Sequence, residues 1–228
     1  MSADDQKRLA GEAAALRVEA GMTVGLGTGS TAAWFVKALA ARGLDGLRCV
    51  PTSERTADLA RELGLTLSTL EDTPRIDLTV DGADEIGPGL ALIKGGGAAL
   101  LREKLVWEAS ERCICIADAA KVVPVLGTFP LPIEVVAFGH KTTANRIADV
   151  LADHDIPMPA RVRQADRGLI RTDGGNLIYD AACKVIADPA RLAADLKSLT
   201  GVVEHGLFLD LTDLAIIGTD AGFETINP

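Results

Sequence analysis

Two carboxylates lie three residues apart in the run Asp81-Gly82-Ala83-Asp84-Glu85, which directly follows the apolar stretch 76–80. In a turn, such a pair can face one cavity, where repulsion between poorly solvated carboxylates would let one keep a proton near neutral pH. That behaviour suits acid–base catalysis. It also suits a metal ion, but no further His or Asp stands at a matching spacing to complete a ligand set. The alternative interpretation is a solvated turn with an Asx cap.

A cation and a further carboxylate belong to a second segment, which begins with Lys94-Gly95-Gly96-Gly97. Three consecutive glycines are costly in conformational entropy, so a close approach of the backbone to a ligand is a natural reason for them. Glu103 falls on the second turn of the helix predicted to follow, either as a catalytic carboxylate or as an exposed residue beside Lys104. Lys121 follows the strand predicted over 112–117 and can reach the same rim.

A third segment, Gly25-Leu26-Gly27-Thr28-Gly29-Ser30-Thr31, is rich in glycine and hydroxyl groups. It is not a dinucleotide-binding fingerprint, because Ser30 stands where that motif requires its last glycine, and it is not a P-loop, because no Lys precedes its Ser or Thr. It is a glycine-lined turn that leads into a helix, whose first N–H groups and dipole favour a phosphate. The alternative interpretation is that Ser30 only caps the helix.

The other reactive residue types show no comparable pattern. The three histidines have no partner at a useful spacing, and the chain contains no G-x-S-x-G nucleophile motif. Cys113 and Cys115 stand two apart rather than in the C-x-x-C spacing of zinc and redox sites, so the four cysteines are interpreted as small buried apolar residues. No metal site is predicted.

Strands and helices alternate through the first half of the chain and place these segments. The predicted strands cover 22–26, 47–50, 65–67, 76–80 and 112–117. The predicted helices cover 4–20, the stretch after Thr31 with apolar residues at 32, 35, 36, 39 and 40, and residues 53–63 and 98–109. This alternation is typical of an α/β protein with a doubly wound, mainly parallel, Rossmann-like sheet. Ligands of such sheets bind where strands end, and all three segments fall at such places.

The pattern changes near residue 129 and predicts a second, smaller domain. Its elements are a strand at 133–138, a helix at 143–151, strands at 160–163, 169–172 and 176–180, a helix at 189–199 and a strand at 202–208. Apart from one additional strand in the predicted hairpin of 169–172 and 176–180, this is the β-α-β-β-α-β order, which predicts an inserted α+β domain of the ferredoxin-like, split βαβ type. Strands at 214–217 and 223–226 then return to the first sheet. The predicted domains are 1–128 together with 207–228, and 129–206.

Charge excludes some classes of partner. The 228 residues include 32 acidic and 23 basic side chains, which gives a formal charge of -9. A surface that binds nucleic acid or an anionic membrane needs a basic face, so neither partner is expected. The N-terminus lacks the features of a signal peptide, and no apolar run reaches the about 18 residues of a membrane span, so we expect a cytoplasmic protein. A small anionic substrate remains compatible, because it needs only local positive charge.

Taken in order, these segments resemble the ribose-5-phosphate isomerases of the A type. The similarity extends to Lys121 and to the runs Pro130-Leu131-Pro132-Ile133-Glu134-Val135, Thr172-Asp173-Gly174-Gly175-Asn176, Gly201-Val202-Val203-Glu204-His205-Gly206-Leu207-Phe208 and Ile217-Gly218-Thr219. Each motif alone is weak, but the ordered set covers nearly the whole chain and is highly specific.

The resemblance implies an enzyme that interconverts D-ribose 5-phosphate and D-ribulose 5-phosphate, in the non-oxidative pentose phosphate pathway, without a metal or organic cofactor. Glu103 matches the family's general base, which moves a proton between C2 and C1 through an enediolate. Lys94 matches a cation that stabilises the enediolate oxygens. Asp81 matches a residue assigned to opening the furanose ring, and Asp84 lines the same pocket.

Further positions match the family's substrate contacts. With the carboxylates and the lysine already named, they are Thr28, Gly29, Ser30, Thr31, Asp81, Gly82, Ala83, Asp84, Lys94, Gly95, Gly96, Gly97 and Lys121. Lys7, in a stretch where the family often has paired lysines, is a further candidate for the phosphate. The resemblance also implies a homodimer, with the small domain as a lid or dimerisation domain.

Two alternatives belong to other classes. A sugar-phosphate-binding regulatory module can share this fold, but such proteins usually carry a helix-turn-helix with a basic face, and none precedes the glycine turn here. A related enzyme, such as an acyl-CoA transferase or an amino-sugar phosphate deaminase, is the second alternative, and a deaminase is expected to use a catalytic His that no motif provides. The four residues Asp81, Asp84, Lys94 and Glu103 together favour catalysis over sensing.

Overall fold

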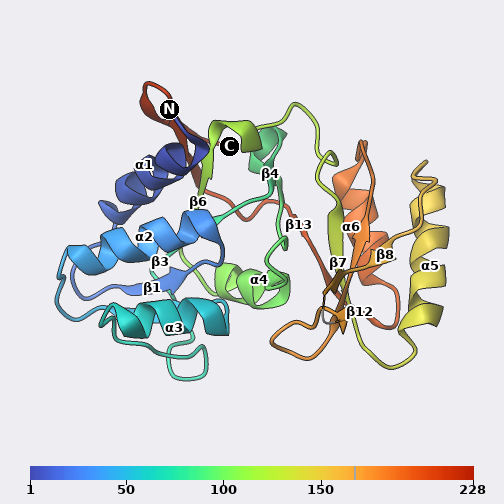
Figure 1. Ribbon diagram of the computed structural model, residues 1–228, viewed down its shortest axis with the longest axis horizontal. Coiled ribbons are helices and arrows are strands. Elements are labelled where there is room, and N and C mark those ends of the chain that lie inside the picture. The colour runs from blue at the N-terminus through green and yellow to red at the C-terminus, as the bar shows by residue number, and fades with distance from the viewer. Residues whose placement is uncertain (167) are drawn as a thin grey trace. The chain divides into compact units, whose positions relative to one another are not determined.

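The computed structural model describes residues 1–166 and 168–228, which form two units (Figure 1). The first unit contains residues 1–83, 102–122 and 210–228, and the second contains residues 84–101 and 123–209. The sequence prediction assigned all of 1–128 to one domain. In the structure, residues 84–101, 123–128 and 207–209 group with the second unit, in which a strand at Leu92–Ile93 pairs with one at Leu207–Phe208.

The first unit is built on a six-stranded sheet with the order β15-β14-β6-β3-β1-β2. Its strands are β1 (Thr23–Leu26), β2 (Arg48–Pro51), β3 (Leu78–Gly82), β6 (Cys113–Asp118), β14 (Leu214–Thr219) and β15 (Gly222–Ile226). Neighbouring strands are parallel except in the β14–β15 pair. The order confirms the predicted mainly parallel sheet. It also places β1 at the point where the direction of winding reverses, between β2 and β3.

Four helices accompany this sheet, namely α1 (Ala3–Ala15), α2 (Ser30–Ala41), α3 (Glu54–Glu62) and α4 (Leu100–Glu108). A capping box between Ser2 and Asp5 starts α1, and the Ser53 hydroxyl accepts the Thr56 N–H at the start of α3. Helices α1 and α2 pack against each other, and α1 also contacts β6 and β14 (Figure 1). Within the described part of the chain, no helix has both the length and the apolar character that crossing a membrane requires.

Alternate residues of β1 face opposite sides of the sheet. Val24 and Leu26 are buried in a core that they share with Phe35 and Leu39 of α2. Gly25 faces the other side, where a Cβ atom would lie 2.8 Å from Val106 of α4. Helices therefore cover both faces of the sheet, as the alternating pattern predicts.

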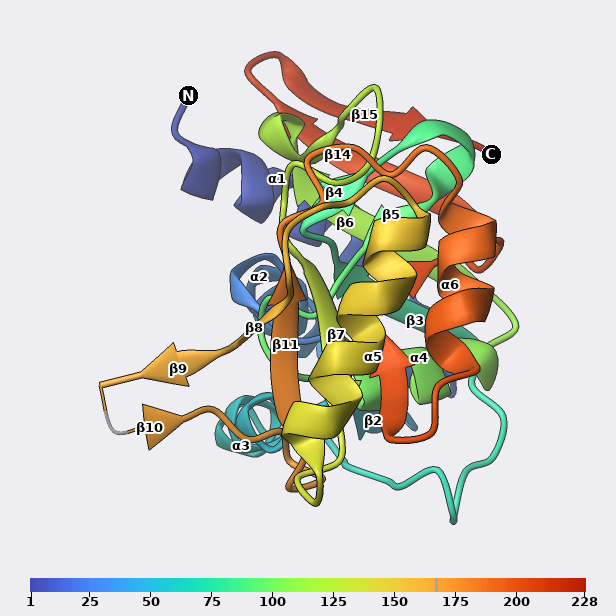
Figure 2. The same ribbon diagram turned by 90° about the vertical axis from the view of Figure 1, so that its right-hand side faces the viewer.

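The second unit contains a four-stranded antiparallel sheet with the order β12-β7-β11-β8. Its elements are β7 (Leu131–Val135), α5 (His140–Asp153), β8 (Arg161–Val162), β11 (Leu177–Ala181), α6 (Pro189–Lys197) and β12 (Val202–His205). Figure 2 shows α5 and α6 side by side over β7 and β11, and Leu131, Ile133 and Val135 are buried in the core of this unit. This arrangement confirms the predicted split βαβ topology.

Shorter elements complete the chain. Strands β4 (Glu85–Ile86), β5 (Leu92–Ile93) and β13 (Leu207–Phe208) form a small sheet, and β9 (Gln164–Ala165) pairs with β10 (Gly168–Leu169). The 3-10 helix η1 (Pro88–Leu90) connects β4 to β5, and η2 (Ala119–Lys121) follows β6. The glycine segment 95–97 therefore leaves the end of a strand of the second unit.

Four elements differ from the sequence predictions. The strand predicted over 169–172 is a strand only at Gly168–Leu169 (β10), which pairs with β9. Residues 65–67 make only one bridge, from Leu67 to Cys49, instead of a strand. The strand predicted over 202–208 divides at Gly206 into β12 and β13, where a Cβ atom would lie 2.2 Å from the Lys94 carbonyl oxygen. Helix α1 ends at Ala15 rather than near residue 20, with Leu16 as its C-cap, and Arg42 donates to the carbonyls of Ala15 and Val18 beyond this end.

All four cysteines are buried, as predicted, and burial raises the pKa of Cys49 to about 12 and that of Cys183 to about 11. Because the thiolate is the reactive form, we expect these two thiols in the native protein at pH 8 to react with a thiol reagent at least about 100-fold more slowly than in the unfolded chain. Stopped-flow labelling with and without denaturant measures the ratio. Rapid labelling of Cys49 or Cys183 in the native protein would contradict the burial.

Candidate active site

The carboxyl ends of β1 and β3 lie next to each other in the first sheet, and the glycine turn and the acidic segment follow them. Asp81, in β3, is completely buried. Its Oδ1 accepts hydrogen bonds from the backbone N–H groups of Thr28, at 3.0 Å, and Gly82, at 2.7 Å. The Asp81 carboxylate thereby ties the turn after β1 to the end of β3, and the interpretation of this residue as part of a solvated turn is wrong.

Two glycines of the turn are required by its geometry. A Cβ atom on Gly27 would lie 2.1 Å from Oδ1 and 2.3 Å from Cγ of Asp81, so only glycine lets that carboxylate approach the turn. Gly29 has a φ of 120°, in a region that side chains rarely allow. Both positions therefore disfavour a side chain, Gly27 for lack of space and Gly29 for its backbone conformation.

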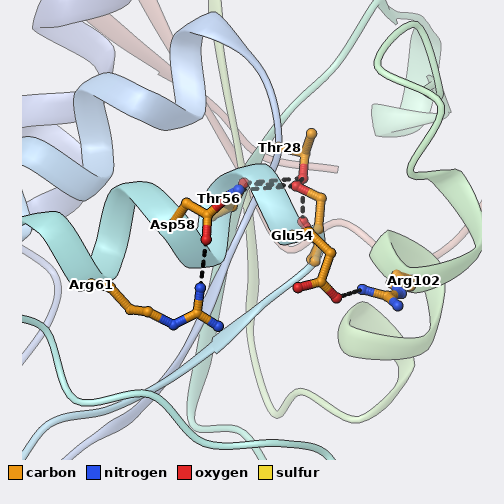
Figure 3. Close-up of polar contacts among 8 residues, drawn as sticks. Thr28, Glu54, Thr56, Asp58, Arg61 and Arg102 are labelled. Atoms are coloured by element: carbon orange, nitrogen blue, oxygen red, sulfur yellow. Dashed lines mark hydrogen bonds and ion pairs between the residues drawn. The ribbon is translucent and has the colours of Figure 1, made fainter. Parts of the chain in front are cut away.

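Hydroxyl groups from the segment after β2 hold the same turn. The Thr28 Oγ1 atom lies 2.7 Å from Thr52 Oγ1, 2.8 Å from Ser53 Oγ and 3.2 Å from Thr56 Oγ1 (Figure 3). Thr56 in turn donates to the Gly27 carbonyl at 2.9 Å. Thr28 was predicted as a substrate contact, and the structure shows its hydroxyl bonded within the protein. Sequence reasoning missed the other three hydroxyls, although three of them within five residues after a strand were a visible signal.

The start of α2 has the properties of an anion site. Its N-cap is Gly29, which offers no side-chain cap, so the alternative in which Ser30 caps this helix is wrong. Ser30 is instead the first residue of the helix, and its Oγ accepts a hydrogen bond from Lys7 Nζ at 3.2 Å. The first N–H groups of a helix and its dipole attract anions, and Lys7 of α1 adds a positive charge at the same end.

Helix α4 carries Glu103, whose side chain belongs to the interior. Glu103 is 3% exposed and Lys104 is 7% exposed, so the interpretation of Glu103 as a solvated helix residue is wrong. The start of the helix is anchored by Arg102, which donates to Glu54 of α3 at 2.8 Å (Figure 3). That hydrogen bond holds the pKa of Glu54 below its usual value. The Arg102–Glu54 pair thus fixes the residue that immediately precedes Glu103.

Lys121 ends the short helix η2, which follows β6 in the first unit. The Asp118 carboxylate accepts the Ala120 N–H at 3.1 Å and so caps η2. Gln6 of α1 accepts the Ala119 N–H at 3.2 Å, which ties this turn to the helix that carries Lys7. Both predicted cations of the first unit thus stand on elements that are joined to each other.

The second unit holds Asp84, Lys94 and the three glycines. The Asp84 carboxylate accepts the Gly96 N–H at 2.7 Å, and a Cβ atom on Gly96 would lie 2.6 Å from Asp84 Oδ1. Lys94 is 2% exposed, its backbone N–H donates to the Gly206 carbonyl at 2.9 Å, and its Nζ lies 5.4 Å from the centre of the Phe208 ring. A buried ammonium next to an aromatic face gains cation–π stabilisation. The structure thus joins Asp84 to the glycine loop.

Glu85, the last residue of the acidic segment, serves the fold. It is buried, and its carboxylate accepts the backbone N–H groups of Gly127, at 2.7 Å, and Phe129. Each acidic residue of the segment therefore binds the backbone of a different loop. Sequence spacing did not reveal these three partners, because they lie between 12 and 53 residues away along the chain.

In the part of the chain that the structure describes, the histidines and the acidic residues form no cluster that could hold a metal ion. His140 Nδ1 lies 2.6 Å from the Tyr179 hydroxyl, and His154 Nε2 lies 2.8 Å from Asp195 Oδ2. His205 follows Glu204, with its Nε2 3.7 Å from a carboxylate oxygen of that residue. All three histidines belong to the second unit and have local partners.

Two open cavities lie on either side of α3 in the first unit. One, of 530 Å³, is bordered by Gly27 and Gly29 of the turn. The other, of 510 Å³, lies between α3 and α4, with Arg61 and Arg102 on its rim (Figure 3). Arg61 is paired with Asp58 at 2.6 Å, as Arg102 is with Glu54. Because Glu71 and Asp72 also line the second cavity, its charged side chains are three acidic and two basic and give no excess of positive charge.

Comparison with known proteins identifies relatives along the whole chain. The family model described as "Ribose 5-phosphate isomerase A (phosphoriboisomerase A)" matches residues 48–222. A ribose-5-phosphate isomerase A of Caulobacter vibrioides is 70% identical over 228 residues, and one of Parvibaculum lavamentivorans is 51% identical over 230 residues. In both cases the alignment covers 100% of each chain, so it includes the glycine turn that precedes the family match.

Solved structures agree with this similarity. A D-ribose-5-phosphate isomerase in complex with phospho-erythronic acid superposes with a TM-score of 0.93 at 36% identity, covering 100% of both chains. A ribose 5-phosphate isomerase from Plasmodium falciparum superposes with a TM-score of 0.92 at 36% identity, covering 99% of both chains. With its α/β fold, its ordered motifs and this full-length similarity, the chain belongs to the ribose 5-phosphate isomerase A family.

Proposed function

We propose that this chain interconverts D-ribose 5-phosphate and D-ribulose 5-phosphate by proton transfer through an enediolate, in the non-oxidative pentose phosphate pathway. Membership of the family, at 70% identity over the full length, is the observation that carries the proposal. It makes a regulatory module of the same fold the less favoured alternative. The burial of Asp81, Glu103 and Lys94, which match the family's working residues, adds physical support.

Glu103 is the proposed general base. The aldose-to-ketose reaction removes the proton from C2 and moves that electron pair onto the C1 carbonyl oxygen to form the enediolate. A proton then passes from O2 to O1, and a proton is returned to C1 as the C2 carbonyl forms. A single carboxylate can remove and return that proton if it is held over both carbons. Glu103 suits this role because it is buried on a helix whose start is fixed by the Arg102–Glu54 pair. Its position is therefore set before substrate binds.

The second proposed role is stabilisation of the enediolate oxygens. We assign it to Lys94, whose buried ammonium meets the developing negative charge without a large rearrangement of solvent. The N–H group of Gly97, in the loop at 95–97, contributes in the same way. Asp84 holds that loop through the Gly96 N–H, so its role is both substrate contact and support.

The sugar ring must open before the proton at C2 becomes acidic, and we assign that step to Asp81. A carboxyl group can shuttle the proton between the anomeric hydroxyl and the ring oxygen. Oδ1 of Asp81 accepts hydrogen bonds from two backbone N–H groups, and these fix the orientation of the carboxylate. Gly82 and Ala83 continue the same loop, and we propose that they contact the sugar.

The phosphate anchor is proposed at the start of α2. Ser30 and Thr31 provide the first helical N–H groups and two hydroxyls, and Lys7 and Lys121 provide charge from adjoining elements. Binding energy from the phosphate, which lies away from the reacting carbons, holds the sugar in position for catalysis. The helix N-terminus and the two lysines provide positive charge locally, so a protein with a formal charge of -9 can bind a dianionic substrate.

The chemistry assigned to Glu103, Lys94 and Asp81 supplies a base, an electrophile and a proton shuttle, so the proposal includes no metal and no organic cofactor. We further propose that the enzyme is cytoplasmic and a homodimer, and that the domain predicted at 129–206 serves as a lid or in dimerisation. The resemblance of the sequence to the family supports these three points.

Turnover without metal tests the proposed function. We expect the purified protein, incubated with ribose 5-phosphate in excess chelator, to form ribulose 5-phosphate at an undiminished rate. Unphosphorylated ribose, used as a control, should react far more slowly because it lacks the anchor. Absence of turnover, or turnover only after a divalent cation is added, would defeat the proposal.

Replacement of the base gives a sharper test. Glu103→Gln should lower kcat by about 10³-fold while phosphosugar binding is retained, because the amide keeps the shape of the side chain but accepts no proton. The matched control is Glu108→Gln, on the exposed face of the same helix, which should be near wild type. A Glu103→Gln enzyme with wild-type kcat would remove Glu103 from its role.

Close packing of the turn against Asp81 predicts that one methyl group is harmful. Gly27→Ala should reduce kcat by about 10² or more, because its Cβ would displace the Asp81 carboxylate. Gly174→Ala is the control, since a Cβ there meets its neighbours at 3.6 Å or more. Steady-state kinetics with circular dichroism separates a displaced carboxylate from loss of fold. Equal activity of the two variants would show that the turn tolerates the shift.

A further inference from the structure

The side chain of Arg163 bonds to the glycine loop, and no catalytic role described above uses it. Its Nη1 donates to the carbonyl oxygens of Gly95, at 2.9 Å, and Gly96, at 3.0 Å. Arg163 directly follows β8, where its own backbone N–H donates to Ile178 at 2.7 Å and its carbonyl accepts Ile170 at 3.1 Å. The guanidinium therefore reaches the loop from a backbone that is bonded on both sides.

Asp180 of β11 fixes the orientation of this guanidinium. Arg163 Nε lies 2.8 Å from one carboxylate oxygen of Asp180, and Nη2 lies 2.5 Å from the other. Such a two-point ion pair leaves little rotational freedom, and it aims the remaining N–H groups of the guanidinium in one direction. The Arg163 side chain is 14% exposed and that of Asp180 26%, so the pair is only partly screened by water. In this structure, the remaining nitrogen, Nη1, points toward the glycine loop.

The loop depends on such outside contacts, because glycines provide no side chains to hold it and lose much conformational freedom on ordering. Asp84 binds Gly96 through its N–H at 2.7 Å, and Arg163 binds the same residue through its carbonyl. All of these groups belong to the second unit. Gly96 is thus held at both of its backbone polar groups by side chains of opposite charge.

The peptide geometry links these contacts to the chemistry. In a planar trans peptide, the N–H points opposite to the C=O. When Arg163 binds the carbonyls of Gly95 and Gly96, the N–H groups of Gly96 and Gly97 are turned to the opposite side of the loop. For Gly96, that is the side on which the Asp84 carboxylate lies. The positive charge of Arg163 also polarises both peptides, which makes their N–H groups better donors.

We propose that Arg163, oriented by Asp180, is a positioning residue that fixes the two peptide planes between residues 95 and 97, so that the Gly96 N–H stays on Asp84 while the Gly97 N–H and the preceding Lys94 are directed at the enediolate oxygens. The inference rests on the proposed function, since it assigns the loop to enediolate stabilisation. Arg163 itself does not touch the substrate. Its contribution therefore belongs to the transition state, and it is expected in kcat more than in KM.

The kinetic test compares variants of two arginines that both bind a glycine carbonyl. Arg163→Ala should lower kcat for ribose 5-phosphate by about 30-fold with KM changed less than about threefold, because only loop geometry is lost. Arg171→Ala is the matched control, since Arg171 donates to the Gly175 carbonyl at 2.7 Å in a hairpin outside the proposed site. Wild-type kcat in Arg163→Ala would overturn the proposal.

Chemical rescue separates positioning from general stability. Added guanidinium at low millimolar concentration should restore part of the kcat of Arg163→Ala, whereas equal sodium chloride should not. Arg163→Lys should stay impaired, because an ammonium cannot bind Asp180 at two points and reach both carbonyls. A loss of kcat that follows the loss of folded protein, with no restoration by guanidinium, would overturn the proposal.

A variant and a binding measurement cover the remaining cases. Asp180→Asn keeps the size of the side chain and should lower kcat by about tenfold with an unchanged Tm. A wild-type kcat in this variant would count against the proposal, even if Arg163→Ala does not fold. Calorimetry should show weaker binding of a four-carbon phosphorylated sugar acid to Asp180→Asn, with unchanged binding of inorganic phosphate. This readout needs no turnover, so failure of the wild-type reaction and failure of the positioning role are distinguishable.

Discussion

The hydrogen bonds from backbone N–H groups to the three carboxylates of residues 81–85 are the interaction on which the arrangement of the loops depends. Asp81 binds the turn after β1, Asp84 binds the glycine loop, and Glu85 binds the segment at 127–129. Hydrogen bonds to a charged acceptor contribute about 1.5–3 kcal/mol each, roughly twice a neutral one. One short stretch of chain thus organises loops from both units while two of its carboxylates keep a proposed catalytic role.

The same principle, side chains that hold backbone, recurs wherever the chain lacks side chains of its own. The turn at 27–29 has two required glycines, and its backbone is held by Thr56 and by Asp81. The loop at 95–97 has three glycines and is held by Asp84 and Arg163. Bare backbone can approach a substrate closely, but it cannot order itself. The neighbouring carboxylates, hydroxyls and guanidinium supply that order.

The fold could be predicted from the sequence because its signals are local. Strands such as β1 and β6 are short apolar runs, α2 has a regular apolar stripe, and Asp188 and Pro189 mark the start of α6. The Glu103 and Asp81 candidates were found because they sit beside glycine-rich segments. Their burial could not be predicted, since nothing in a helix such as α4, with apolar residues around most of its surface, tells which polar residue faces inward.

The sequence did not reveal which residues pair with each other when they lie far apart along the chain. Arg163 lies 68 residues from Gly95, and Glu54 lies 48 residues from Arg102, so no spacing rule connects them. The assignment of residues 84–101 to the second unit has the same origin, because β5, already paired with β4, acquires its second partner only at β13, more than a hundred residues later. Register and partner choice in such pairs are decided by tertiary packing, which a single sequence does not display.

The chain enters each unit more than once, and this affects the order in which the units can fold during synthesis. Strand β14 pairs along its length with β6 and belongs to the last nineteen residues that the first unit receives, from 210 to 228. Until they leave the ribosome, β6 has an open edge of buried residues, Ile114 and Ile116 among them. Residues 123–209 of the second unit are already synthesised by then. The inserted unit can thus fold during translation, whereas the main sheet closes only after residues 210–228 are made, and until then the open edge of β6 is exposed to aggregation.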